Sequence, residues 1–464
     1  MSTMSNQTQT LPPPRGPKGE FLLGNLRDFT RDSLQFILEA RQYGDFVLTM
    51  FGPFPFYIAN HPELVHEVLV TRAASFYKSG VAKNVLKEAV GDGLFTNDGD
   101  SWKRQRKLAQ PAFHTRRIAN YAEVMVDYTQ KLTAGWHSGQ TIDVEREMSA
   151  LTMQIVAKTL FDAHITGEED ELAKAVKVTL RTVDKRFNRL IPLPTWLPIA
   201  ENRDMKQSIA VMDRIIQNFI DERRKTGEDR GDLLSMLIAA QDDEGDHSGM
   251  SDKQLRDEAM TVFGAGHETT SGALTWTFYL LSQHPEVEAK LLEEINRVLG
   301  DRLPTFNDLP NLPYTEMIIK ESMRLFPPAW STTREAIEDV TIGDYAVAKR
   351  NTILINIYGI HRDERFFPNA LQFDPERFSA DNEKNIPRYA YMPFGAGPRV
   401  CIGNAFAMME ARLLLATIAQ RYQLTLAPGQ VVEPHRVFTL RPKFGMKMVV
   451  TVRETVSKTA LEPA

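Results

Sequence analysis

The only cysteine of the chain, Cys401, lies in a glycine-rich segment just before a predicted helix at 403–422. Residues 394–403 read Phe-Gly-Ala-Gly-Pro-Arg-Val-Cys-Ile-Gly. Glycine lets the backbone turn its N–H groups toward the sulfur, and a helix N-terminus also favours thiolate over thiol. A single thiolate with no neighbouring cysteine or histidine makes a poor zinc or iron–sulfur site, because those sites need several ligands. It suits a metal whose other positions are already filled, and haem iron is such a metal.

The alternative is that Cys401 is a small buried hydrophobe, as most lone cysteines are. The flanking glycines favour a metal ligand instead. Arg399, two residues upstream, favours it too, because its guanidinium could neutralise a haem propionate.

A second candidate, the pair Glu268 and Thr269, lies in the middle of a predicted helix at 251–282. Ser251 and Gln254 have capping-box spacing at the start of this helix. An unpaired carboxylate is costly to bury in an apolar run, so Glu268 needs either solvent or a function. A threonine hydroxyl can bond the carbonyl one turn back and open the helix, which leaves room for a ligand and water. We interpret Thr270 as part of a solvent-exposed polar face.

Segment 394–403 matches the cysteine-ligand signature of the cytochrome P-450 superfamily, Phe-x-x-Gly-x-Arg-x-Cys-x-Gly. All five specified positions are present: Phe394, Gly397, Arg399, Cys401 and Gly403. The chain resembles the soluble, bacterial type of this superfamily over nearly its whole length, because further motifs follow in the family's order. The resemblance implies a haem-thiolate monooxygenase in which haem b takes Cys401 as its axial thiolate, with Phe394, Arg399 and Gly403 around the cofactor.

The stretch 264–270 resembles the family's acid–alcohol pair. By that match Thr269 would hydrogen-bond dioxygen at the haem, and Glu268 would connect it to a chain of proton-carrying water. Ala265 would offer a small side chain over the haem.

Other motifs gain weight from the same resemblance. Glu321 and Arg324 share a helix face, and the resemblance places them with Arg377 in a buried charge network. Three further residues are implied to bind the haem propionates: Trp102, Arg106 and Arg334.

The implied reaction inserts one atom of dioxygen into an organic substrate, with electrons from a separate ferredoxin, flavodoxin or flavoprotein reductase. Between Asn97 and Asn120 six basic residues stand against two acidic ones. In the family this helix lies where an acidic electron donor docks. We expect Lys103, Arg104 and Lys107 to face away from the side of Arg106.

The substrate pocket can be outlined by resemblance to the long-chain fatty-acid hydroxylase branch. Phe95, Ala329 and Phe438 join Ala265 as candidate lining residues, and all are apolar. We therefore expect a hydrophobic substrate of fatty-acid, terpenoid or steroid size. That branch carries a basic anchor for a carboxylate near residues 50–56, which here are apolar, and this speaks against a fatty acid.

Two alternatives remain. One is a haem-thiolate peroxygenase or peroxide isomerase, which the intact Glu268–Thr269 pair argues against. The other is a non-catalytic haem sensor, which would need a second domain or a histidine ligand.

The elements that must position these residues are mostly helical. Apolar alternation predicts a hairpin from 46–50 and 54–59, and helical periodicity then dominates, with segments near 101–110, 117–136, 146–162, 170–186, 202–225, 284–299 and 313–325. Strand-like runs cluster late, at 340–342, 352–357, 438–440 and 447–452. We predict a predominantly α-helical α+β fold in one large domain, 19–455, between a flexible N-terminal segment, 1–18, and a flexible tail, 456–464.

Composition limits the partners. A net charge of −5 gives no reason to expect nucleic acid, and we find no apolar run long enough to cross a bilayer. One cysteine cannot form an internal disulfide, so we expect a cytoplasmic protein.

Overall fold

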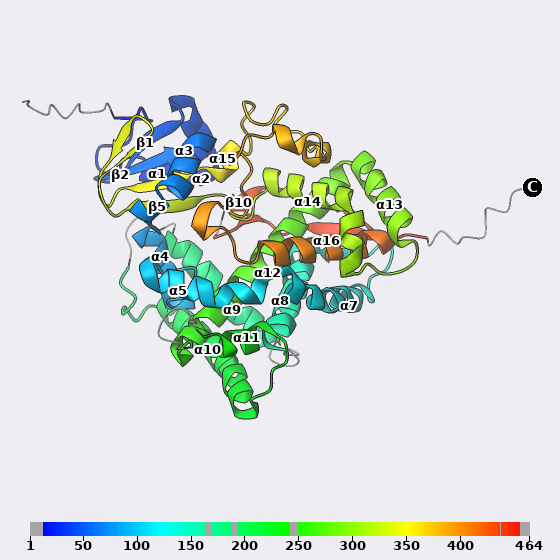
Figure 1. Ribbon diagram of the computed structural model, residues 1–464. Coiled ribbons are helices and arrows are strands. Elements are labelled where there is room, and N and C mark those ends of the chain that lie inside the picture. Colours follow the sequence, from blue (N-terminus) through cyan, green and yellow to red (C-terminus); the bar gives the residue numbers. More distant parts are fainter. Residues whose placement is uncertain are drawn as a thin grey trace, which may run out of the picture.

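A large helical body and a smaller lobe built on a mixed sheet make up the molecule, with the sheet at the upper left of Figure 1. This computed structural model describes residues 13–162, 169–187, 189, 193–241, 249–436 and 438–454. The predicted α+β class with helix predominating is confirmed.

The helices within the described residues are α1 (Leu26–Arg31), α2 (Ser33–Ala40), α3 (Pro62–His66), α4 (Gly80–Val90), α5 (Gly99–Ala109), α6 (Thr115–Ile118), α7 (Ala122–Thr133), α8 (Val144–Phe161), α9 (Glu169–Phe187), α10 (Ala200–Thr226), α11 (Leu233–Ala239), α12 (Asp252–Gln283), α13 (Pro285–Leu299), α14 (Pro313–Leu325), α15 (Ile357–Ile360) and α16 (Asn404–Arg421). The strands there are β1 (Phe46–Phe51), β2 (Phe54–Ala59), β3 (Phe76–Tyr77), β4 (Thr141–Asp143), β5 (Thr332–Ala336), β6 (Val340–Ile342), β7 (Tyr345–Val347), β8 (Thr352–Ile355), β9 (Tyr422–Leu426), β10 (Pro434–Arg436), β11 (Leu440–Pro442) and β12 (Lys447–Val452).

The largest sheet joins the two ends of the chain, in the order β1-β2-β8-β5-β3. The predicted hairpin is confirmed, with β1 and β2 antiparallel and Phe51 opposite Phe54. Strand β8 then pairs parallel to β2, so that Phe56 lies opposite Thr352. This parallel pair brings the segment after α14 beside the N-terminal hairpin.

Helix α12 is the central element of the body (Figure 1) and is 32 residues long. The predicted capping box is present at its start: Gln254 N donates to Ser251 Oγ at 3.3 Å, and Ser251 N donates to Gln254 Oε1 at 3.0 Å. These bonds satisfy backbone and side-chain groups that a helix N-terminus otherwise leaves without partners.

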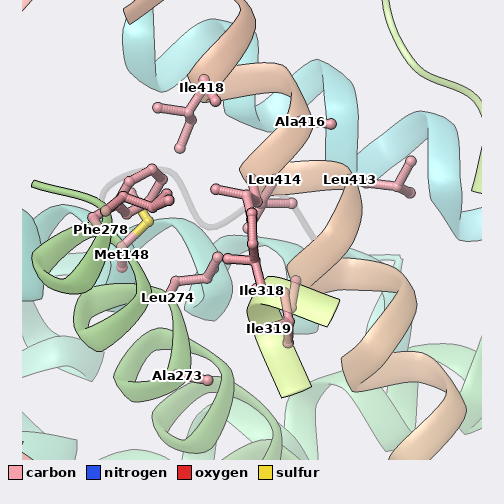
Figure 2. Packing of buried hydrophobic residues seen from close by; sticks show 14 of the residues in the cluster. Met148, Ala273, Leu274, Phe278, Ile318, Ile319, Leu413, Leu414, Ala416 and Ile418 are labelled. Atoms are coloured by element: carbon pink, nitrogen blue, oxygen red, sulfur yellow. The ribbon is translucent and has the colours of Figure 1, made fainter. Parts of the chain in front are cut away.

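Apolar side chains of α12, α14 and α16 interdigitate in the main core (Figure 2). Leu274 and Phe278 of α12 meet Ile318 of α14 and Leu414 of α16, all of them buried. This core fixes α16, which follows Cys401, against α12, which carries Glu268.

Several sequence boundaries were wrong. The strand predicted at 352–357 ends at Ile355 and the chain turns into α15. Phe438, predicted in a strand, lies in a bend before β11. Helices α1, α2, α4 and α11 were not predicted, because short helices depend on packing more than on their own periodicity.

The N-terminal segment packs closer than expected. Leu48 N donates to the Arg15 carbonyl at 3.0 Å, so residues 13–18, which we assigned to the flexible segment 1–18, lie against β1. The remainder of that segment and the tail 456–464 lie outside the described residues.

Candidate active site

Cys401 ends a tight loop between the short helix η9 (Gly397–Arg399) and α16. Its N–H donates to the Phe394 carbonyl at 2.9 Å, which closes the loop. Gly397 has φ +70°, and a Cβ at this position would clash with the Leu69 carbonyl. The glycine is therefore required both for the left-handed turn and for the close approach of the neighbouring backbone.

The Cys401 side chain is accessible to solvent, yet surrounding protein is dense enough that burial raises the pKa of its thiol. A side chain that is accessible to solvent but surrounded by dense protein is expected at the wall of an internal cavity. The Gly403 N–H and the Arg106 guanidinium act the other way and lower the pKa. From the sequence we expected backbone N–H groups that lower the pKa of the Cys401 thiol. We did not foresee that burial raises this pKa by more.

Arg106 and Trp102 project from α5 toward the cysteine loop. Arg106 donates to the Val400 carbonyl at 3.0 Å, next to the thiol. The Arg399 guanidinium lies over the Trp102 ring, with its carbon 4.3 Å from the ring centroid, and donates to Asp98 Oδ1 at 2.5 Å. The predicted Trp102, Arg106 and Arg399 therefore meet on one side of Cys401.

Three cations, Lys78, Arg334 and Arg399, gather beside this loop. Burial and the Arg399 charge lower the pKa of Arg334 to about 10, against a weaker opposite effect of Asp98. Burial, Arg399 and Arg334 lower the pKa of Lys78 to about 7. A largely buried cluster with an excess of cations, in which Arg334 is buried, fits a ligand that brings carboxylates, as the two haem propionates would. Lys78 was missed by sequence reasoning, because a lone lysine after a two-residue strand carries no recognisable pattern.

Glu268 is buried in the middle of α12 but is not unpaired. Its Oε1 accepts from Thr439 Oγ1 at 2.6 Å and lies 2.6 Å from Arg441 Nη2. Arg441 also lies 3.7 Å from Glu145 at its other nitrogen, and both of these side chains are partly exposed. The sequence could not indicate this partner, which lies in β11, far along the chain.

Thr269 Oγ1 donates to the Ala265 carbonyl at 2.9 Å, one turn back, as predicted. Ala265 is exposed although Phe263 and His267 beside it are buried, so this turn of α12 borders open space. The interpretation of Thr270 as a solvent-exposed residue is wrong, since only 3% of its surface is exposed.

Glu321, Arg324 and Arg377 come together in one network. Arg324 donates twice to the Glu321 carboxylate, at 2.6 and 2.7 Å, and Arg377 Nε donates to it at 3.3 Å. Glu321 and Arg324 are both completely buried. Arg377 belongs to the short helix η7 (Pro375–Phe378), so the network ties α14 to the segment that leads to the cysteine loop.

Two of the four candidate pocket residues touch. The rings of Phe95 and Phe438 meet edge to face, with centroids 5.5 Å apart. Ala329 is exposed between buried Pro328 and Trp330, which repeats the pattern seen at Ala265.

Two of the three basic side chains of α5 that we expected to face away from Arg106, Lys103 and Lys107, do not do so. Lys103 and Lys107 line a surface pocket of about 390 Å³ together with Arg106, Trp102 and His114. Both border the same pocket as Arg106, because Lys103 lies three residues before Arg106 and four before Lys107 on the helix.

Comparison with known proteins identifies the family. The sequence model of the cytochrome P450 family matches residues 14–448 of this chain. The chain belongs to this family. This P450 is 39% identical over 426 residues to cyclooctatin synthase of Streptomyces melanosporofaciens, a match that covers 91% of this chain and 92% of the relative. It is 34% identical to pentalenene oxygenase of Streptomyces avermitilis, covering 93% of this chain and 96% of the relative. The crystal structure of the cytochrome P450DA heme domain superposes with a TM-score of 0.88 at 28% identity, covering 96% and 99% of the two chains.

The family settles the cofactor and the class of activity. This P450 is a haem-dependent monooxygenase, and its cofactor is haem b with an axial cysteine thiolate, for which Cys401 is the only cysteine present. The reaction needs a substrate, dioxygen and a redox partner. Across the part of the chain that the structure describes, no helix is both long and apolar enough to cross a membrane.

Proposed function

We propose that this P450 hydroxylates or epoxidises a neutral, terpenoid-like compound. The observation that carries the proposal is the apolar character of the four candidate pocket residues, two of which, Phe95 and Phe438, are in contact. The hairpin 46–59 has no charged residue, so it offers no anchor for a carboxylate. The names of relatives that form cyclooctatin or oxidise pentalenene support the same class of substrate.

Haem b supplies the activation of dioxygen when it is bound, and the chain has to hold it and deliver protons. We infer that Cys401 is the axial ligand, in the loop built by Phe394, Arg399 and Gly403. Four further side chains would hold the propionates: Lys78, Trp102, Arg106 and Arg334. Arg399 would add positive charge beside them, although it also pairs with Asp98.

Protons would reach the pocket along α12. Glu268 lies at the inner end of a polar row that continues through Arg441 to Glu145, and both of these side chains are partly exposed. Water along this row would bring the proton to Glu268 Oε1, because a guanidinium does not release its own proton. Thr269 would hold a proton at Oγ1 beside Ala265, where the helix borders open space. The ion pair with Arg441, whose Nη2 lies 2.6 Å from Oε1, holds the Glu268 carboxylate in place beside Thr269.

The electron donor would be an acidic ferredoxin or flavodoxin, or a flavoprotein reductase. It would dock over the α5 pocket, where Lys103 and Lys107 lie beside Arg106. Complementary charge speeds such an encounter, so electron transfer should slow as salt is raised.

The test is titration of the holoprotein with pentalenene, followed by the low- to high-spin change of the haem spectrum, with a long-chain fatty acid as the comparison. We expect the terpene to give the spin change and the fatty acid to give little. A spin change with the fatty acid alone would contradict the substrate class. Product formed from hydrogen peroxide alone, at the rate seen with the reductase system, would favour the peroxygenase alternative.

A further inference from the structure

The loop 91–98 joins α4 to α5 and carries Phe95. It lies directly on the first half of α12. At Gly91, where φ is +70°, a Cβ would clash with the Asp257 carboxylate, and at Gly93 it would clash with Thr261 Oγ1. The loop backbone therefore approaches α12 more closely than any residue with a side chain would allow.

Two neighbouring carboxylates of α12 bind alternate N–H groups of this loop. Asp92 N donates to Asp257 Oδ2 at 2.9 Å, and Leu94 N donates to Glu258 Oε2 at 3.0 Å. Leu94 is also held at its carbonyl, which accepts from Lys78 Nζ at 2.6 Å, and Lys78 donates in the same way to the Phe95 carbonyl.

The two carboxylates differ in what else they bind. Asp257 is paired with Lys253 and Arg256, at 2.6 and 2.8 Å, so its charge is compensated on α12 itself. Glu258 is completely buried, and its Oε1 has no hydrogen-bond partner among the described residues. Burial raises the pKa of Glu258 to about 7, with Asp257 adding to the rise and Leu94 N and Lys78 opposing it. A buried acid with this single partner contributes little to α12, and its one hydrogen bond among the described residues goes to the loop.

We propose that Glu258 is a positioning residue that clamps the loop 91–98 onto α12 and so holds Phe95 in the wall of the ligand pocket. The inference rests on the proposed place of Phe95 in that pocket. Glu258 itself touches neither substrate nor cofactor. Loss of the Glu258 bond would leave the Leu94 N–H without its acceptor, so that Lys78 alone of these two side chains would still hold the backbone before Phe95. The Phe95 ring itself contacts the Phe438 ring and Lys78 in the part of the chain that the structure describes.

The first test is amide hydrogen exchange of the holoprotein over residues 91–98, followed by mass spectrometry. In Glu258→Leu we expect exchange in this loop to be about tenfold faster, because Leu94 N loses its hydrogen-bond acceptor. Glu258→Gln keeps an acceptor oxygen at the same distance and should restore most of the protection. Glu288→Gln, which changes a buried carboxylate on α13, is the matched control and should leave the loop unchanged.

The second test is ligand binding to the haem of the same variants. 4-Phenylimidazole needs the pocket wall, so its affinity should fall several-fold in Glu258→Leu and recover in Glu258→Gln. Imidazole is too small to reach the pocket wall, so its affinity for the haem should not change. Unchanged loop exchange in Glu258→Leu overturns the clamp. Faster loop exchange with unchanged 4-phenylimidazole affinity would overturn the placement of Phe95 in the pocket wall. That result would not count against the proposed haem site. Should Glu258→Leu fail to load haem, Glu258→Asp, which draws the carboxylate back by one methylene, must show the same faster exchange.

Discussion

Removing the Glu321 carboxylate should be the most damaging single change outside the cysteine loop. Glu321 and Arg324 have no exposed surface, and the carboxylate accepts four hydrogen bonds, from Arg324 Nε and Nη2, Arg377 Nε and Asp374 N, at 2.6 to 3.3 Å. In Glu321→Ala the Arg324 guanidinium keeps its backbone acceptors but loses its counter-charge in a site that water cannot reach.

Leaving one buried charge without its partner costs roughly 3–5 kcal/mol, a fifth or more of the total stability of a typical domain. We therefore expect Glu321→Ala to accumulate mostly as haem-free or insoluble protein. Urea unfolding of the soluble fraction, together with the haem content from the spectrum of the reduced carbon monoxide complex, measures both effects.

Lys290→Ala is the control for this experiment. Lys290 pairs with Glu376 of the same η7 segment at 2.9 Å, but both side chains are about half exposed. Such a surface pair contributes about 1 kcal/mol or less. A Glu321→Ala protein with normal haem content, destabilised no more than Lys290→Ala, would refute the reasoning.

The other predictions concern chemistry and pH. Cys401→Ser should abolish the far-shifted absorption band of the reduced carbon monoxide complex, and an unchanged band would disprove thiolate ligation. Thr269→Ala should still bind haem and substrate but divert electrons to hydrogen peroxide, measured as product formed per electron; an unchanged ratio would remove its proton-holding role. Arg441→Gln should slow turnover at constant substrate affinity and enlarge the solvent isotope effect on kcat, because Glu268 loses its ion pair; equal isotope effects would contradict the route. Burial and the charges of nearby arginines lower the pKa of His361 to about 3, so the folded protein keeps it neutral while the unfolded chain takes up a proton below about 6.5. Stability should therefore fall as the pH drops from about 6.5 toward 3, by about 2 kcal/mol at pH 5 from this group, and a His361→Gln protein with the same pH slope would count against it.

Local signals in the sequence predicted local structure well. The capping box at Ser251 and Gln254, the turn of Thr269 onto the preceding carbonyl and the hairpin 46–59 each depend on residues within a few positions of one another. Because each of these features depends on residues that are close in the sequence, a local sequence pattern is enough to predict it.

Partners that lie far apart in the chain could not be predicted in this way. Arg441 reaches Glu268 across 173 positions, from residue 268 to residue 441, and only the packing of β11 on α12 creates the pair. The same holds for Lys78 and Glu258, which meet at the loop 91–98 from opposite sides. Thr270 looked polar by type, but its burial depends on α16, which the sequence places more than a hundred residues later.

The parallel pair β2–β8 has a consequence for synthesis. Strand β2 ends at Ala59 and its partner begins at Thr352, so about 290 residues must be made before the partner exists. At 5–20 residues per second, one edge of the hairpin waits for roughly 15–60 s with its backbone groups open to any other extended chain. Through most of translation the open edge of β2 can therefore pair with the extended segment of another nascent chain, until β8 emerges and covers it.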